Sequence, residues 1–550
     1  MAQAILAPSP ALPTAAMWRR PAAAASSRLC GRSSAAGVSC PEPAVSSASP
    51  ERSHPAMGGV NCGIEAETDR FEAPASARLE GPGASTGMAA SMAPQPMPPL
   101  APADLEALAR AAEEMLQTID VDLDRRVVTV GGGRFEDDLN SYSLLDRISL
   151  SQKRALVAAA SQDIGLDRAM GSMCGMGIGD ALGHPFEFQP AQDVPSAGSP
   201  YFNLRTMRFH NEANTFRLER GQWTDDAAMG LCMADSFLVQ RMFDGSDMRV
   251  RFWCWWNRGY NNAFRKDTRR SSSVGLGGNI AKSLHAISRV SSKSEVPPVY
   301  DAATEDSGNG SLMRFTPVAV FLHAADMQTV HDVARKSSYT THPGIIAAEA
   351  CSLLAHLIVA ALRLPQGEPR CVRTFLEQTT EDYLHASGLA RRSGWGYDQI
   401  KWLVTSKPVK MTERCWNWKA EHLDVEGTLR ARGYKYNGYP VSSGYFGAYA
   451  PDGLAMALWS VYHTRSFDEA VARSVNLLGD ADSHGSITGQ LAGAIYGYRA
   501  INPQFLEWLN RWDDNDFAVR AVLLRHIGSK FGEGATASAA PSSPTDFPPL

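Results

Sequence analysis

Two stretches of the chain, TDDAAMGLCMADSF (residues 224–237) and GDADSHGSITGQLAGAIYG (residues 479–497), decide the fold. In each, Asp together with Thr or Ser leads into a run of small and apolar residues. Runs that are apolar nearly all round are typical of helices buried on every side. The acidic starts allow two interpretations, because Asp and Thr are favoured helix caps and also oxygen ligands for hard metal ions.

Helical periodicity continues on both sides of these two stretches. Between about residue 149 and residue 531, apolar residues recur at the spacing of helices, whereas strict alternation is almost absent. We therefore predict an all-α fold, a compact single-domain helical bundle, because no repeat of about 20 to 50 residues indicates a solenoid. The predicted helices are 151–163, 170–183, 225–242, 279–289, 329–338, 344–363, 372–385, 452–463, 467–478, 485–499, 503–511 and 516–528.

The chain divides into four predicted regions. Residues 1–100 are rich in Ala, Pro, Ser and Gly, which predicts a disordered or targeting segment. Residues 101–148 are predicted to be an N-terminal helical extension, in which RRVVTV (125–130) reads as a short strand with no obvious partner. Residues 149–532 form the main domain, and residues 533–550 a disordered tail. Within the main domain, residues 406–450 are rich in Trp, Tyr and Gly and read as an excursion over the surface, which either contacts the ligand or packs its own aromatic residues.

The overall composition argues against several classes of function. With 53 basic and 58 acidic residues the net charge is −5, so nucleic acid is a poor partner. No segment approaches the roughly 20 apolar residues that span a bilayer, so no membrane association is expected. The nine Cys contain no CxxC pair and fit buried thiols in a reducing compartment. We expect a monomer.

The amino-terminal 50 residues contain four Arg, one acidic residue and many Ser. This composition is shared by organelle transit peptides and by plain disordered tails, and it lacks a secretory apolar core. The expected location is therefore the cytoplasm, or a plastid or mitochondrion if residues 1–60 act as a transit peptide.

The two acidic clusters together favour metal binding over capping. Four uncompensated carboxylates at the starts of buried helices would each be costly, so a positive group must neutralise them. Carboxylate and hydroxyl oxygens suit Mg²⁺ or Mn²⁺, and two triplets supply enough ligands for two such ions. Zinc fits poorly because no His and Cys cluster has ligand spacing. The candidate metal ligands are Thr224, Asp225, Asp226, Asp480, Asp482 and Ser483.

Five motifs, in this order, resemble the ADP-ribosylglycohydrolase family. They are GSMCGMGIGDALGHPFEF (171–188), GQWTDDAAMGLCMADSFL (221–238), GNGSLMRFTPVAVF (308–321), YTTHPGIIAAEAC (339–351) and NLLGDADSHGSITGQLAGAIYG (476–497). The resemblance covers about residues 165–530. It implies an all-α fold with a binuclear Mg²⁺ or Mn²⁺ centre that cleaves the bond between ADP-ribose and an acceptor.

The resemblance also implies roles for individual residues. Both metal triplets match the family, except that the position of Ser483 is usually Thr, and His484 replaces a small or apolar residue and either reaches the ligand or faces solvent. Glu187 matches the acidic residue that acts near the anomeric carbon, and Asp180 reads as a structural cap. The expected substrate-binding residues are Gly277, Gly278, Asn279, Gly308, Asn309, Gly310, Ser311 and His342.

From the residues alone, three of these assignments keep a simpler alternative. Glu187 is about as consistent with an ordinary surface Glu as with a residue that acts in general acid or base catalysis. The Gly-rich segments SVGLGGN (273–279) and SGNGS (307–311) offer backbone amides to a diphosphate, but turns are the commoner use of such sequences. A lone His such as His342 is more often a satisfied structural residue than a catalytic one.

These observations predict a metal-dependent hydrolase that cleaves the glycosidic bond between ADP-ribose and an acceptor. The substrate would be an ADP-ribosylated protein or an ADP-ribose-containing small molecule, with Arg, Ser and small-molecule acceptors all open. The rival hypotheses are a non-catalytic ADP-ribose reader, a crystallin-like structural relative and an unrelated all-α metal phosphohydrolase.

Overall fold

Several helices in the structure start at a side chain that caps them. At the predicted start of the main domain, Ser149 accepts a hydrogen bond from the Gln152 N–H, and the Gln152 side chain accepts one from the Ser149 N–H, which is a capping box. The structure is a computed structural model that describes residues 102–534, apart from 118, 123–126, 131–132, 136–138, 289–294, 303, 306 and 370. The predictions for residues 1–100 and for the carboxy-terminal tail from residue 535 onward lie outside the described residues.

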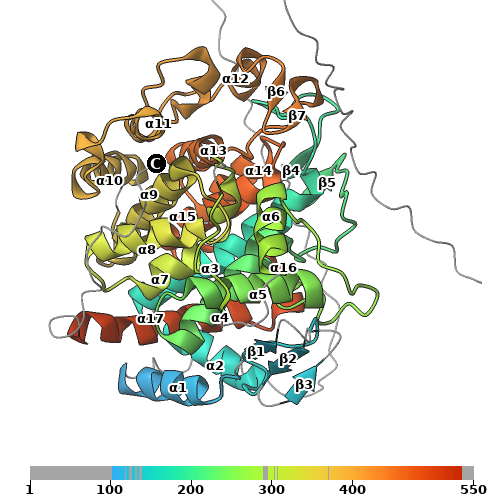
Figure 1. Cartoon of the computed structure of the whole chain (residues 1–550), viewed down its shortest axis with the longest axis vertical. Helices are drawn as coiled ribbons and strands as arrows, with labels where there is room; N and C mark the ends of the chain where they lie inside the picture. Colours follow the sequence, from blue (N-terminus) through green and yellow to red (C-terminus); the bar gives the residue numbers. More distant parts are fainter. Residues whose placement is uncertain are drawn as a thin grey trace, which may run out of the picture. The chain divides into compact units, whose positions relative to one another are not determined.

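Helices account for most of the described chain (Figure 1). They are α1 (Pro102–Glu114), α2 (Leu150–Ala160), α3 (Ile164–Gly183), α4 (Asp225–Gln240), α5 (Gly245–Arg258), α6 (Gly278–Ile287), α7 (Thr316–Phe321), α8 (Met327–Tyr339), α9 (Ile345–Leu362), α10 (Val372–Ala386), α11 (Trp395–Thr405), α12 (Val425–Ala431), α13 (Ala450–Tyr462), α14 (Phe467–Val475), α15 (Ala481–Tyr496), α16 (Pro503–Asp513) and α17 (Asp516–Gly534). Short 3₁₀ turns include η1 (His184–Phe186), η3 (Asn309–Ser311) and η5 (Met411–Trp416).

The strands of the described chain are short and antiparallel. β1 (Ile119–Asp122), β2 (Val127–Val130) and β3 (Gly133–Phe135) form one sheet, with β2 in the middle. β4 (Tyr201–Asn203) pairs with β5 (Arg208–His210), and β6 (Lys435–Tyr436) with β7 (Tyr439–Pro440). The strand predicted near residues 125–130 therefore has partners on both sides, which the sequence did not reveal.

The prediction of an all-α fold is confirmed. Each predicted helix has a counterpart, but α5, α7, α11 and α12 were missed. In α5 the reason is that charged side chains occupy buried positions. Arg251 is fully buried and pairs with Asp247, and the guanidinium of buried Arg249 donates to the Pro297 and Val299 carbonyls. Charged residues on the buried face hide the apolar stripe on which helix prediction depends.

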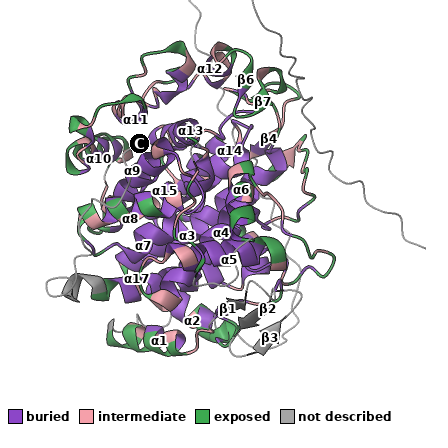
Figure 2. Ribbon diagram, viewed as in Figure 1, coloured by how far each residue is buried: buried purple, intermediate pink, exposed green. Residues whose placement is uncertain are grey.

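The centre of the domain is the pair α3 and α15, which Figure 2 shows among the buried helices. Glycines on the two helices meet backbone to backbone. A Cβ at Gly175 would lie 2.1 Å from the Gly489 carbonyl oxygen, and one at Gly179 would lie 2.1 Å from that of Gly485. Only glycine allows this approach, which places the end of α3 against the acidic start of α15.

We expect Gly489→Ala to destabilise the protein by about 3 kcal/mol or more, because its Cβ would meet the Gly175 carbonyl oxygen at 1.9 Å. The gain in helix propensity of about 1 kcal/mol is too small to offset this overlap. Denaturant unfolding measures the difference. The control is Gly278→Ala, where a Cβ has no neighbour within 4 Å. Equal stability of the two variants would contradict the close packing of α3 and α15.

Helix α9 differs from the expectation that no segment of the chain is long and apolar enough to span a bilayer. It is 18 residues long with a mean hydropathy of 2.2, and by length and composition it is the one helix among the described residues that is able to cross a membrane. In the structure 89% of it is buried, and it packs against α8, α13 and α15.

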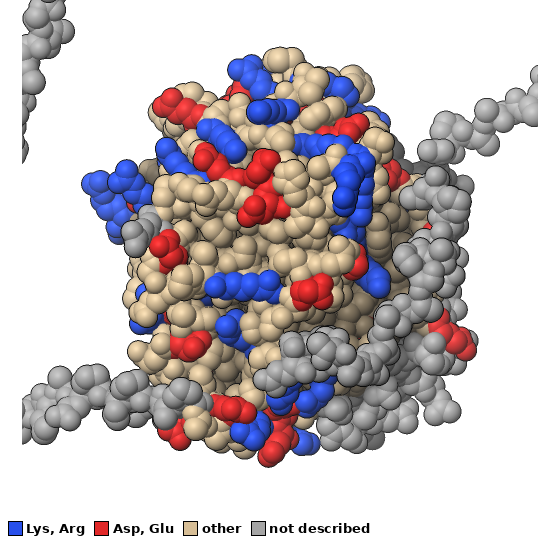
Figure 3. All heavy atoms as spheres, turned by 90° about the vertical axis from the view of Figure 1, so that its left-hand side faces the viewer, with Lys and Arg blue, Asp and Glu red and all other residues tan. Residues whose placement is uncertain are grey.

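Charged side chains are mixed on the face that Figure 3 presents. Lys and Arg lie interspersed with Asp and Glu across the described part of this face. Such a surface carries no extended field of a single sign.

Candidate metal and ligand site

The two acidic clusters meet at the starts of two buried helices. Asp225 and Asp226 are the first two residues of α4, while Asp480 directly precedes α15 and Asp482 lies in its first turn. All four residues are at most 6% exposed. Asp225, Asp480 and Asp482 line the same cavity, so segments some 250 positions apart in the sequence bring their carboxylates into one region.

These side chains do not cap their helices in the usual way. Neither Thr224 nor Asp480 makes a side-chain cap hydrogen bond. The start of α4 is instead capped by Asp180 of α3, which accepts hydrogen bonds from the Thr224 N–H (2.9 Å), the Ala227 N–H (3.0 Å) and the Thr224 hydroxyl (2.9 Å). Because Asp180 already satisfies the helix end, capping does not account for Asp225 and Asp226.

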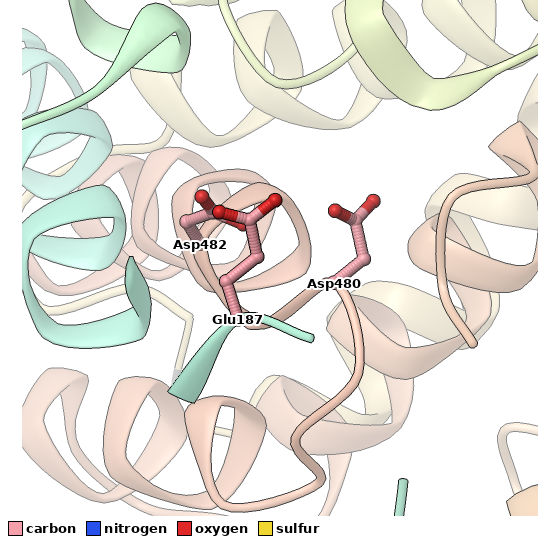
Figure 4. Close-up of side chains that lie close together, drawn as sticks. All are labelled: Glu187, Asp480 and Asp482. Atoms are coloured by element: carbon pink, nitrogen blue, oxygen red, sulfur yellow. The ribbon is translucent and has the colours of Figure 1, made fainter. Parts of the chain in front are cut away.

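Glu187 joins the cluster from the segment after η1. Carboxylate oxygens of Glu187, Asp480 and Asp482 all lie within 4.8 Å of one another, and Figure 4 shows the three side chains converging. Glu187 is 8% exposed. Its Oε2 atom and Oδ1 of Asp226 are buried without a hydrogen-bond partner among the described residues. Such orphaned acceptors in a buried acidic cluster indicate a position for a cation or ligand.

The electrostatics of the cluster are unfavourable without a cation. Burial, together with neighbouring carboxylates, holds the pKa values of Glu187, Asp225 and Asp226 well above their usual range. Burial followed by the charge of Asp482 raises the pKa of Asp480 to about 7, and burial followed by Asp180 raises that of Asp482 to about 6.

The described residues supply no paired cation for this cluster. No ion pair joins Lys, Arg or His to any of the five carboxylates in the part of the chain that the structure describes. The donors are carboxylate and hydroxyl oxygens, the set preferred by hard divalent cations. The residues present therefore fit a divalent metal ion, whereas the His and Cys ligands typical of zinc are missing from this set.

A cavity of about 420 Å³ opens beside the carboxylates. Predicted site residues that line it are Glu187, Asp225, Asp480, Asp482, Ser483, Gly277, Gly278, Asn279, Gly308, Asn309, Gly310 and His342. Gly275 lies against Asp225, where a Cβ would come within 2.1 Å of its Oδ1 atom. The Gly-rich segment 273–279 thus runs directly over the first acidic cluster.

Three predicted site residues lie outside the cavity lining. Two of them are Thr224 and Asp226, and the Thr224 hydroxyl approaches Asp226 Oδ2 at 3.3 Å. Ser311 is turned away from the cavity, because its hydroxyl accepts hydrogen bonds from Ser338 (2.9 Å) and Cys351 (3.4 Å). The structure therefore places Ser311 among buried residues that support the cavity wall and not in contact with the ligand space.

His484 follows neither of the two expectations made for it. Its ring is fully buried, with Nδ1 at 3.0 Å from the Ser474 hydroxyl and Nε2 at 2.8 Å from the Leu478 carbonyl. Burial lowers the pKa of His484 to about 4. The residue neither reaches the cavity nor faces solvent, and its contacts tie the first turn of α15 to α14 and the loop between them.

Aromatic residues that the sequence analysis did not name individually form one wall of the cavity. Tyr445 donates a hydrogen bond to Asp480 (2.8 Å), and its ring stacks on Phe188 with 5.7 Å between centroids. The ring centroid of Tyr439 lies 4.4 Å from that of Tyr445, and Phe216 packs edge-on against Phe188. The available signals were the position of Phe188 directly after Glu187 and the aromatic, Gly-rich composition of residues 406–450.

Phe188 also holds an uncommon backbone conformation. Its φ of +66° lies in the left-handed region, which a bulky side chain rarely adopts. The Phe188 N–H donates to the Gly479 carbonyl at 2.9 Å, so the turn after Glu187 is fastened to the residue before Asp480. This turn directs Glu187 inward and the Phe188 ring toward the cavity mouth.

The fold and site define an all-α protein with a buried acidic centre beside a ligand-sized cavity. The chain belongs to the ADP-ribosylglycohydrolase family, whose family profile matches residues 161–530.

Similar proteins come from bacteria and animals. The chain is 27% identical over 368 residues to ADP-ribosylarginine hydrolase Tri1 of Pseudomonas putida, covering 65% of this chain and 77% of that protein. It is 24% identical to the ADP-ribosyl-[dinitrogen reductase] glycohydrolase of Rhodospirillum rubrum (63% and 90% covered). It is 25% identical to ADP-ribosylhydrolase ARH3 of Gallus gallus (62% and 88% covered). A solved structure titled ADP-ribosylglycohydrolase-related protein complex aligns at a TM-score of 0.44 and 26% identity, covering 66% of this chain and 99% of that chain.

Proposed function

We propose that the protein hydrolyses the glycosidic bond between ADP-ribose and an acceptor, releasing ADP-ribose. The observation that carries this proposal is the position of Glu187, whose orphaned carboxylate oxygen lies beside Asp480 and Asp482 at a cavity lined by Gly-rich segments. Membership of the family and the names of the relatives support the same reaction.

We further propose that two Mg²⁺ or Mn²⁺ ions are the cofactors. The ligands would be Thr224, Asp225 and Asp226 from one cluster, with Asp480, Asp482 and Ser483 from the other. When bound, the ions supply positive charge that offsets the carboxylates and polarises oxygens of the ligand. The orphaned Oδ1 of Asp226 and the raised pKa values of the cluster support a cationic partner.

The chain itself would bind and orient the diphosphate. Helix α6 starts at Gly278 without a side-chain cap, so N–H groups of its first turn remain available, and Gly278 and Asn279 line the cavity. The amino-terminal end of a helix attracts anions through these N–H groups and the helix dipole. Gly308 and Gly310 lack side chains that would block a close approach of the ligand.

Glu187 would hold and move the proton. Water must lose a proton as it attacks the anomeric carbon, and the acceptor must gain one as it leaves. A buried carboxyl group whose pKa is raised is suited to this exchange near neutral pH. Tyr445 and Phe188 cover this side of the cavity and limit the access of bulk water.

The aromatic wall would contact the acceptor, which is the protein side chain or the small molecule that carries the ADP-ribose. We expect Tyr439→Ala to raise the KM for ADP-ribosylated substrates up to about tenfold, the value of a lost aromatic contact, with the affinity for free ADP-ribose unchanged. Steady-state kinetics on arginine- and serine-linked substrates, beside calorimetry with ADP-ribose, measure both. The control is Tyr434→Ala, because Tyr434 is 86% exposed and does not line the cavity. Equal effects of the two changes would exclude a role for this wall.

The overall reaction is tested by incubating the full chain and Mg²⁺ with ADP-ribosylated proteins and small molecules. Release of free ADP-ribose is the expected result. A protein that binds ADP-ribose but releases none from any substrate would support the non-catalytic reader instead.

A further inference from the structure

A buried chain of polar side chains reaches the cavity from behind. Arg314, which is fully buried, donates from Nη2 to the Thr341 hydroxyl at 2.6 Å. The same hydroxyl lies 2.8 Å from Nδ1 of His342. Thr341 is fully buried and His342 is 2% exposed, and of the three only His342 lines the cavity.

The direction of each hydrogen bond in this chain follows from chemistry. A guanidinium has donors only, so the Thr341 oxygen must accept from Arg314. The hydroxyl hydrogen of Thr341 then has one acceptor among the described residues, which is Nδ1 of His342. If Nδ1 itself carried a hydrogen, the Thr341 hydroxyl hydrogen would be buried without an acceptor, which is costly. Nδ1 therefore accepts.

The ring of His342 is also neutral. Burial, followed by the charge of Arg314, lowers the pKa of His342 to about 3. A neutral imidazole carries one hydrogen, and since Nδ1 accepts, the hydrogen sits on Nε2.

Nε2 faces the ligand space. A Cβ at Gly310 would lie 3.0 Å from Nε2 and one at Gly308 would lie 3.5 Å from it, so the ring packs on the loop that lines the cavity. Among the described residues Nε2 has no hydrogen-bond partner, and the first-turn N–H groups of α6 face the same cavity. The hydrogen-bond donors on this wall, which are Nε2 of His342 and the first-turn N–H groups of α6, are suited to a ligand with acceptor oxygens.

We propose that Arg314 and Thr341 are positioning residues that fix His342 as the Nε2–H tautomer, so that it donates a hydrogen bond to an oxygen of the bound ligand. The proposal rests on the proposed function only where it names that ligand as ADP-ribose. The tautomer itself is a property of the protein before any ligand binds.

The tautomer is measured by NMR on the full-length protein labelled with ¹⁵N in its histidine rings, with the His342 signals assigned by their loss in His342→Gln. The expected wild-type spectrum has Nδ1 in the range of a bare nitrogen and Nε2 in the range of a protonated one. Thr341→Val should lose this preference, and Thr341→Ser, which restores the hydroxyl, should regain it. A wild-type spectrum with Nδ1 protonated would overturn the proposal even if neither Thr341 variant folds.

The matched control is Thr340→Val. Thr340 also accepts from Arg314 (3.2 Å), but its hydroxyl donates to the Ser337 carbonyl and does not touch His342. This change should leave the His342 signals in place, whereas an equal loss in both Val variants would assign the effect to general disturbance and overturn the relay.

Ligand binding supplies the second readout. ADP-ribose affinity, measured by calorimetry with Mg²⁺ present, should fall by roughly threefold to tenfold in Thr341→Val, the value of one hydrogen bond, and recover in Thr341→Ser. Unchanged affinity in Thr341→Val would overturn the donation to the ligand. If wild-type protein binds no ADP-ribose, the proposed function fails, while the tautomer spectrum still decides the relay.

Discussion

Replacing Asp482 with Asn is expected to lower turnover by roughly a hundredfold or more, since even partners of metal ligands cost about tenfold to a hundredfold when removed. The same change should raise the melting temperature of the cation-free protein. Asp225→Asn should behave alike, because both carboxylates would serve one centre. The double variant should be hardly less active than either single variant, since residues that act as a unit are not additive.

The expected gain in stability follows from the pKa values. Asp482 and Asp480 titrate near pH 3.8 when unfolded, but at about 6 and about 7 in the folded protein. A carboxyl whose folded pKa is raised contributes stability below its unfolded pKa and loses that contribution as the pH rises through the folded value. The cation-free protein should therefore lose stability between about pH 4 and pH 7, and Asp482→Asn should remove part of this loss. Thermal melts across pH in the presence of a chelator measure it.

A capping carboxylate provides the matched control. Asp326 is an exposed N-cap of α8 that accepts from the Thr329 N–H at 2.9 Å, and the hydrogen bond from the Thr329 hydroxyl, followed by this backbone bond, lowers its pKa. Asp326→Asn should cost a few tenths of a kcal/mol at most and leave activity intact. If Asp482→Asn gave the same small loss and kept its activity, the second acidic cluster would be a helix cap, and the same result for Asp225→Asn would make the first cluster a cap.

Glu187→Gln is expected to lower turnover by about a hundredfold to ten-thousandfold, the usual contribution of a positioned acid or base. The amide is similar in size but cannot exchange a proton, so binding of divalent cations and of ADP-ribose should persist. Single-turnover kinetics beside calorimetry separate the two effects.

Glu413→Gln is the control for this change. Glu413 is also buried, its Oε2 atom has no hydrogen-bond partner among the described residues, and burial raises its pKa, yet it does not line the cavity. Wild-type turnover is expected for Glu413→Gln. Retained turnover in Glu187→Gln would remove Glu187 from the proton-transfer role.

The sequence predicts most of the helices because their signals are local. Periodicity and the capping Ser149 identify α2, and the nearly uniform apolar character of α4 and α15 identifies the central helices. The missed helix α5 shows where such reasoning fails. Arg251 is buried in a pair with Asp247 of the same helix, and Arg249 is buried against carbonyl groups outside the helix that only the folded chain supplies.

The two Asp clusters of the site could also be predicted from the sequence, because their signals are local. Two Asp clusters at the starts of buried helices require a common neutralising partner wherever the helices pack. The individual residues of the aromatic wall could not be chosen from composition alone, because the contact of Tyr445 with Asp480 and with Phe188 joins segments that are far apart in the chain. His484 also depended on tertiary structure, since its partners Ser474 and Leu478 become available only when the α14–α15 connection folds back.

The most direct test of the central claim is calorimetric titration of ADP-ribose into the full-length protein with Mg²⁺, with a chelator, and into Asp482→Asn with Mg²⁺. If the two acidic clusters form one cation-dependent ADP-ribose site, wild-type protein binds with Mg²⁺, and binding weakens by orders of magnitude in the other two titrations. Equal binding of ADP-ribose in all three titrations, or no binding in any, would contradict it.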